Sequence, residues 1–100
     1  MPTYSVLAVT PKNEDWIPDY LPIANALVAK HGGRYLARTA HHAQVEGDTQ
    51  PAALRILLEW PNKEPAENFM ADPEYRPHLN ARTAGSDSFH FVIHGKDDLA

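Results

Sequence analysis

The segment HGGRYLAR, residues His31–Arg38, most constrains the fold, because it joins the end of a helix to the start of a strand through a tight reversal. Gly32 and Gly33 follow an apolar run that ends at Lys30, and glycine adopts the left-handed conformation that closes a helix without steric cost. The residues from Tyr35 onward have the composition of a strand. We therefore expect a helix up to Lys30 and a strand directly after it.

Length and composition indicate a single domain over residues 1–100, with residues 95–100 as a flexible tail. The 9 basic and 13 acidic residues give a net charge of −4 without any basic stripe, so we expect no nucleic-acid partner. The absence of cysteine excludes disulfides, thiolate nucleophiles and cysteine zinc sites. No apolar run approaches the roughly 18 residues of a membrane span, and we expect a cytoplasmic protein with no membrane partner.

Hydrophobic periodicity and turn residues predict seven elements. The expected strands are Tyr4–Val9, Arg34–Ala40, Ala53–Trp60 and Ser88–His94, and the expected helical segments are Asp15–Lys30, Pro65–Met70 and Asp72–Arg82. Pro18 and Pro22 predict an irregular lead-in and allow the first regular helix to begin at any residue from Asp15 to Asp19, and Pro77 is expected to bend the last helix. Between the second and third strands we expect a turn near Glu46–Gln50, with Ala43–Val45 extending the second strand past a bulge.

This order is β-α-β twice over, which is the plan of the ferredoxin-like fold. The expected class is α+β, with a four-stranded antiparallel sheet. Right-handed crossovers place both helical regions on the same face of that sheet.

Alternation along the strands divides their side chains between the two faces of the sheet. In the third strand Leu54, Ile56, Leu58 and Trp60 share one face, and Arg55, Leu57 and Glu59 share the other. In the last strand Phe89, Phe91 and Ile93 share one face, and His90, Val92 and His94 share the other. We expect the uniformly apolar sets to lie under the helices and the mixed sets to be covered by a second copy in a homodimer, the alternative being a wet, open sheet face.

Four motifs in order resemble the family called domain of unknown function 1330. They are VAKHGGRYLAR at 28–38, VEG at 45–47, LLEWP at 57–61 and MADPEYRPHLNAR at 70–82, and together they span most of the chain. The sequence departs from the family pattern at Trp60, where phenylalanine is usual, and in the prolines of the first helix. The resemblance implies a dimeric α/β barrel, a superfamily that contains small monooxygenases, haem-degrading enzymes, lactone isomerases and ligand-sensing domains.

In such barrels the ligand cavity lies between sheet and helices, which gives six candidates for its rim. The candidates are His31, Arg34, Trp60, Tyr75, His78 and Arg82. The arginines suit an organic anion, His31 and His78 suit proton transfer as the catalytic groups, and the aromatic residues suit stacking on a flat molecule. Each also has a structural interpretation, such as a helix-end contact, a core anchor or an ion pair.

We predict no metal site and no cofactor. His41 and His42 are adjacent, so their side chains point apart, and no HExxH-like spacing or phosphate-binding loop is present. Two main functions remain: a cofactor-independent oxygenase or isomerase for a small planar acidic molecule, and a homodimer that binds a ligand or only assembles, without chemistry. A weaker alternative is haem binding or degradation through Trp60 and His78.

Overall fold

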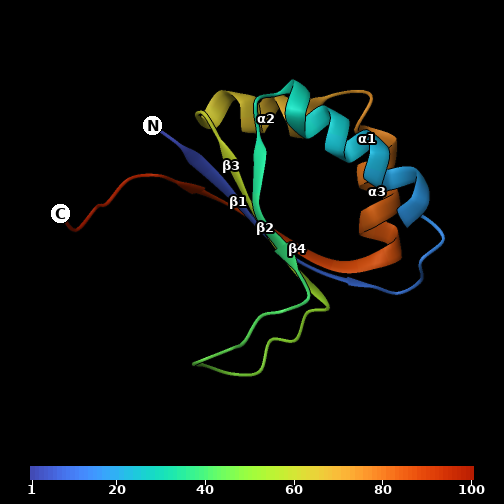
Figure 1. The fold of residues 1–100 in the computed structure, drawn as a ribbon, viewed down its shortest axis with the longest axis horizontal. Helices are drawn as coiled ribbons and strands as arrows, with labels where there is room; N and C mark the ends of the chain where they lie inside the picture. The colour runs from blue at the N-terminus through green and yellow to red at the C-terminus, as the bar shows by residue number, and fades with distance from the viewer.

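The computed structural model describes all 100 residues and contains four strands and three helices (Figure 1). In chain order these are β1 (Thr3–Pro11), α1 (Ile17–Lys30), β2 (Arg34–Thr39), β3 (Leu54–Trp60), α2 (Lys63–Ala71), α3 (Arg76–Gly85) and β4 (Ser86–His94). All strand pairs are antiparallel, and the order across the sheet is β2-β3-β1-β4. The predicted ferredoxin-like fold is confirmed.

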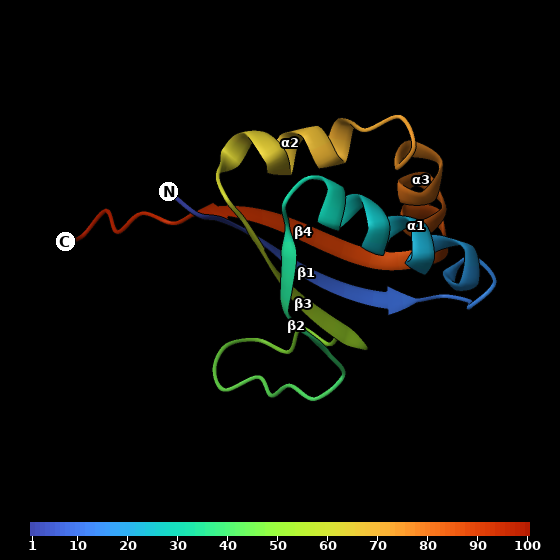
Figure 2. The ribbon, with the colours of Figure 1, turned by 45° about the horizontal axis from the view of Figure 1, so that its top comes forward.

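The molecule has two layers, with the three helices on one face of the sheet and the other face uncovered (Figure 2). The link between β2 and β3 is a long loop beyond the end of the sheet, and residues 43–45, predicted to extend β2, form no strand. Gln44 closes this loop on itself by donating from Nε2 to the carbonyls of Glu46, Gly47 and Asp48. No helix combines the length and the apolar character needed to cross a membrane.

The glycine pair acts at the junction of α1 and β2 in two different ways. Gly32 has φ +79°, the left-handed conformation expected after a helix. Gly33 is needed for space, since a Cβ atom there would lie 2.6 Å from Cζ3 of Trp60. The Gly32 amide donates to the carbonyl of Ala29 and the Gly33 amide donates to the carbonyl of Val28, both in the last turn of α1.

The prolines interrupt the helices less than predicted. Helix α1 begins at Ile17, inside the expected interval from Asp15 to Asp19, because Pro18 falls in the first turn, where no backbone donor is required, and the helix continues through Pro22. Pro77 also lies in a first turn, that of α3, so it starts the helix instead of bending it. The expected helix start at Asp72 is wrong. Asp72 is the C-cap of α2 and the centre of the turn to α3, where its Oδ1 accepts from the Glu74 amide at 2.9 Å.

The predicted faces of β3 are correct and those of β4 are wrong. Directly paired residues of antiparallel strands share a face, and buried Leu7 of β1 pairs with His90, whereas Val6 pairs with Phe91. His90, Val92 and His94 therefore lie on the helix side of the sheet, while Phe89, Phe91 and Ile93 lie on the uncovered side. Alternation groups the residues of a strand correctly, but the register with β1 decides which group faces the helices.

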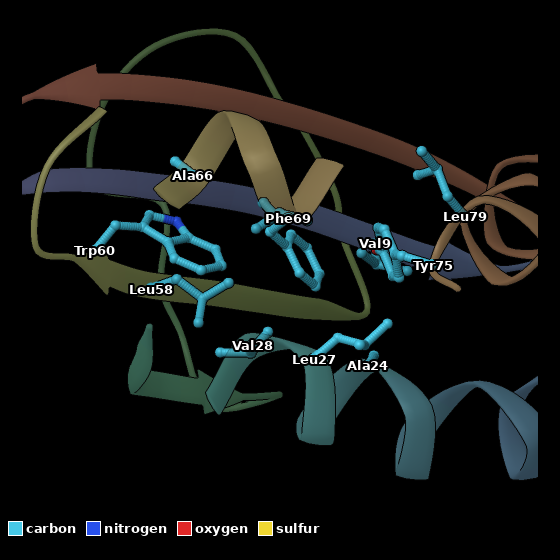
Figure 3. Packing of buried hydrophobic residues seen from close by; sticks show 11 residues of the cluster. Val9, Ala24, Leu27, Val28, Leu58, Trp60, Ala66, Phe69, Tyr75 and Leu79 are labelled. Atoms are coloured by element: carbon cyan, nitrogen blue, oxygen red, sulfur yellow. The ribbon is translucent and has the colours of Figure 1, made fainter. Parts of the chain in front are cut away.

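The core is a cluster of 11 buried hydrophobic residues between the helices and the sheet, and the aromatic side chains of Trp60, Phe69 and Tyr75 form a row within it (Figure 3). The ring centroids of Trp60 and Phe69 are 5.2 Å apart, and those of Phe69 and Tyr75 are 4.2 Å apart. Trp60 donates from Nε1 to Oγ of Ser5 at 2.9 Å, which pairs its one polar atom. Burial stabilises such a row by about 1.5–3 kcal/mol per large side chain, and two of its members, Phe69 and Tyr75, also line a cavity.

Candidate functional site

A cavity of about 160 Å³ lies between the sheet and helices α1 and α3. Its walls are mainly apolar and come from the helix side of β1 and β3, from α1, and from Phe69 of α2. Apart from the indole of Trp16, whose Nε1 donates to the Gly85 carbonyl, six of the lining side chains carry polar atoms: Tyr20, Tyr35, Arg38, Tyr75, Arg82 and His90. The cavity therefore combines an apolar surface for a flat molecule with a few groups able to orient it.

Arg82, on α3, is the buried charge of the site. Arg82 is only 5% exposed, and its Nη1 lies 3.4 Å from the hydroxyl oxygens of both Tyr20 and Tyr75. Its Nε has no hydrogen-bond partner. No carboxylate pairs with Arg82 and none lines the cavity. A buried guanidinium without a counter-ion costs free energy that an anionic group at this position offsets.

The hydroxyl groups of Tyr20 and Tyr75 lie 2.7 Å apart and share one hydrogen bond. That bond uses one of the two hydroxyl protons, so the pair keeps a second proton to donate. Burial, followed by the neighbouring Tyr20, raises the pKa of Tyr75 far above its ordinary value. The two tyrosines therefore act as neutral hydrogen-bond groups beside the Arg82 charge.

His90, on β4, reaches the same cavity from the sheet. Its Nε2 is buried and has no hydrogen-bond partner. Burial, and then the positive charge of Arg82, lowers the pKa of His90 to about 4. The imidazole is therefore neutral near pH 7 and keeps a lone pair able to accept a proton.

Arg38 and Tyr35 form the β2 side of the cavity. The Arg38 guanidinium lies over the Tyr35 ring, 3.8 Å from its centroid, and its Nη1 donates to Oδ1 of Asn25 at 2.7 Å. Burial raises the pKa of Tyr35. Arg38 adds a second positive charge to a site without acidic groups, so the cavity as a whole favours anions.

Of the six residues predicted for the rim, the structure brings Tyr75 and Arg82 together at the cavity and places the other four elsewhere. Arg34 lies on the uncovered face of the sheet, where its Nε donates to Glu59 at 2.9 Å and its side chain is 70% exposed. His31 binds Asp72, with 2.8 Å between Nε2 and Oδ2. The hydrogen bond from His31, followed by that from the Glu74 amide, lowers the pKa of Asp72 to about 2. His31 therefore joins the end of α1 to the α2–α3 turn.

Trp60 and His78 do not line the cavity either. Trp60 is fully enclosed in the core, and His78 is half-buried on α3. A cavity of about 150 Å³ in another protein accommodates benzene, so about 160 Å³ suits one substituted ring and not the four rings of a porphyrin. The structure gives the haem alternative no support. No three His, Asp or Glu side chains gather into a possible metal site.

Sequence reasoning missed four of the polar groups of the cavity: Tyr20, Tyr35, Arg38 and His90. Tyr20 belongs to the apolar stripe of α1, so from the sequence it is interpreted as a packing residue and its hydroxyl group gives no separate signal. For His90 a signal was present, because Ser86, Ser88 and His90 form a polar row of alternate residues in β4. Such a row under helices indicates a place where apolar packing is incomplete.

Comparison with known families and structures agrees with this architecture. The family model for a domain of unknown function, DUF1330, matches residues 2–96. No curated protein matches the sequence.

Three solved structures illustrate the likeness in fold. A protein of unknown function from Rhodopseudomonas palustris has a TM-score of 0.79 at 15% identity, over 96% of this chain and 83% of that one. SnoaB from Streptomyces nogalater, described as a cofactor-independent oxygenase, has a TM-score of 0.64 at 17% identity, over 98% and 96% of the two chains. An antibiotic biosynthesis monooxygenase has a TM-score of 0.51 at 15% identity, over 97% and 100%. At these identities the likeness concerns the fold alone.

Proposed function

The chain belongs to the DUF1330 family, and on that premise we propose that it is an enzyme of the cofactor-independent oxygenase or isomerase type. Its substrate is a small, planar, acidic organic molecule that binds in the cavity between the sheet and helices α1 and α3. The description of SnoaB as a cofactor-independent oxygenase supports this type of reaction on this fold.

The observation that carries the proposal is Arg82, which is buried in the cavity without a carboxylate partner. A carboxylate, phenolate or enolate entering beside Arg82 would pair with the guanidinium and with the remaining hydroxyl donor of the tyrosine pair. The apolar wall, including Phe69, would hold the flat part of the molecule.

These groups suit reactions that pass through an enolate. A carbonyl compound that loses a proton from the adjacent carbon to a neutral base in the cavity, such as an imidazole, develops negative charge on its oxygen, and donors fixed around that oxygen stabilise the transition state. The enolate then regains a proton at another carbon in an isomerase, or reacts with dioxygen as co-substrate in an oxygenase. Both reactions need the same anion site, so the site supports an isomerase and an oxygenase equally.

Anion binding provides the first test, with benzoate as the probe. Arg82→Met removes the cation, and we expect it to weaken benzoate binding by about 10–100-fold, the usual effect of losing a hydrogen bond to a charged group. Arg34→Met is the matched control, because Arg34 lies on the other face of the sheet and should leave the affinity unchanged. Equal affinities of the two variants, measured by titration calorimetry, would contradict the assignment of the site.

Solvent-deuterium exchange tests for catalysis. Single-ring cyclic ketones and phenols are incubated with the protein in deuterium oxide, and exchange at the carbon next to the oxygen-bearing carbon is followed by NMR, with dioxygen uptake measured in parallel. We expect exchange that depends on Arg82. Benzoate binding without exchange or dioxygen uptake by any of these compounds would leave the non-catalytic ligand-binding function instead.

The uncovered face of the sheet supports a second part of the proposal, a homodimer. Phe89 is 65% exposed, Phe91 66% and Ile93 51%, and they lie side by side with the open face of β1. Contiguous exposed apolar surface of this kind usually marks an interface. Arg55, Leu57 and Glu59 of β3 belong to the same face and extend it.

Sedimentation velocity at micromolar concentration tests this interface. We expect a dimer for the parent chain and a monomer for Phe91→Glu, which places a charge in the centre of the apolar face. Lys63→Glu is the control, because it changes charge on exposed α2 on the opposite side of the sheet. A parent chain that sediments as a monomer would refute the dimer.

A further inference from the structure

Two of the side chains that line the cavity, Arg82 and His90, each carry a buried polar atom without a hydrogen-bond partner, Nε and Nε2 respectively. They come from different elements, α3 and β4, and both side chains line the same cavity. Buried polar atoms are hydrogen-bonded in the great majority of cases, and exceptions require an explanation. Two exceptions in one cavity point to a common ligand.

The two atoms require different partners. Nε of Arg82 is always a donor, whereas Nε2 of a neutral imidazole supplies a lone pair in one tautomer. A carboxylate satisfies the arginine and gives the histidine no proton. A hydroxyl group has what both atoms require, a proton for Nε2 and an oxygen lone pair for the guanidinium.

The volume of the cavity limits the rest of the ligand. About 160 Å³ corresponds to one six-membered ring with small substituents, by comparison with the cavity of about 150 Å³ that holds benzene in another protein. The wall is mainly apolar, which excludes strongly hydrated molecules such as sugars.

We propose that the cavity binds a single-ring phenol or cyclic enol and that His90 accepts its hydroxyl proton while Arg82 holds the resulting oxyanion. The O–H bond of the ligand breaks, an N–H bond forms at Nε2, and the charges of phenolate and imidazolium balance. This assignment rests on the proposed anion site and adds the class of ligand and a catalytic role for His90.

The surroundings of His90 agree with this role. The titratable groups that share its cavity are Arg82 from α3, Tyr20 from α1, Tyr75 from the α2–α3 turn, and Tyr35 with Arg38 from β2. None is acidic, so nothing in the cavity stabilises an imidazolium until the oxyanion of the ligand is bound. Proton transfer and ligand binding are therefore coupled.

The experiment uses 4-nitrophenol, whose phenolate is yellow, at a pH where most of the free phenol is protonated. We expect the parent protein to bind it and to produce the absorbance of the phenolate, and to bind 4-nitroanisole, which lacks the proton, at least tenfold more weakly. His90→Phe should lose the phenolate absorbance and about tenfold in affinity. His90→Gln keeps an acceptor without basicity, so it should bind the phenol and leave it protonated.

Several outcomes would overturn the proposal. Equal affinity for the phenol and the anisole would mean that the cavity recognises shape alone, and phenolate absorbance in both His90 variants would exclude histidine as the acceptor. If benzoate binds in an Arg82-dependent manner but 4-nitrophenol stays protonated, the role of His90 fails and the anion site stands. If neither probe binds, the anion site fails as well.

Discussion

Replacing Gly33 by alanine tests directly how closely the backbone packs on Trp60, because the added methyl group would clash with this buried side chain. The new Cβ would lie 2.6, 2.7 and 3.1 Å from Cζ3, Cε3 and Cη2 of Trp60, where real contacts are rarely below 3.0 Å. Trp60 is 1% exposed, stacks on Phe69 and donates to Ser5. Accommodating the methyl group therefore means displacing the ring.

The expected loss follows from these contacts. Overpacking a filled core costs about 1–3 kcal/mol, and weakening the bond between Trp60 and Ser5 adds about 0.5–1.5 kcal/mol. Gly33→Ala should therefore lower the free energy of unfolding by about 1.5–4.5 kcal/mol. For a domain of this size that is a fall in Tm on the order of 10 °C or more.

Gly32→Ala and Gly32→Asn are the matched controls one residue away. At Gly32 the cost is conformational, since φ is +79° and the nearest Pro61 atom would lie 3.3 Å from the new Cβ. Alanine in that conformation costs about 1–2 kcal/mol, and asparagine costs less because it tolerates the left-handed region. The order of stability should be parent, Gly32→Asn, Gly32→Ala, Gly33→Ala.

Urea unfolding followed by tryptophan fluorescence, at one protein concentration, gives the four free energies. Trp60→Phe removes the ring atoms nearest to Gly33, so the cost of Gly33→Ala should shrink by at least about 1 kcal/mol in that background. A Gly33→Ala variant within about 0.5 kcal/mol of the parent, or an unchanged cost beside phenylalanine, would refute the close-approach argument.

Three further predictions concern charged and titratable groups. The pKa of His90 is about 4 in the folded chain and about 6.5 when unfolded, so the unfolded state binds the proton first. Stability should fall by about 2 kcal/mol between pH 6.5 and 4, allowing for partial exposure of the ring. Urea unfolding of His90→Phe across this range should show a smaller fall, and an equal fall would exclude His90 as its source. Asp72 has the same direction of dependence, because its pKa is lowered to about 2. The stabilisation that it provides is present above its unfolded pKa of about 3.9 and lost as the pH falls to about 2. Asp72→Asn should accordingly be less stable than the parent at pH 6, with the gap closing in acid, whereas a constant gap would show that charge is not involved. In the monomeric Phe91→Glu background, Arg34→Met should change stability by less than about 0.5 kcal/mol, since the Arg34–Glu59 pair is exposed in the single chain, and thermal unfolding with a larger loss would contradict that estimate.

The order of elements, the class of fold and the junction at HGG follow from the sequence alone. Each depends on local properties: the periodicity of apolar residues, the turn chemistry of glycine and proline, and the handedness of crossovers. The predicted start of the last helix at Asp72 was wrong, and the start of the first helix was predicted only as an interval, Asp15 to Asp19. A proline or an aspartate near a helix end is compatible with several positions relative to the helix terminus, such as the N-cap, the first turn or the C-cap, and the tertiary contacts select one of them.

Only the tertiary structure decided which groups form the site. Alternation in β4 separated His90 from Phe91 correctly, but the pairing of Leu7 with His90 determined that the histidine faces the helices. Tyr20, Tyr75, Arg82 and His90 meet in the cavity although they come from α1, the α2–α3 turn, α3 and β4. Local sequence rules describe neighbours along the chain, whereas contacts across the chain depend on register and on the packing of whole elements.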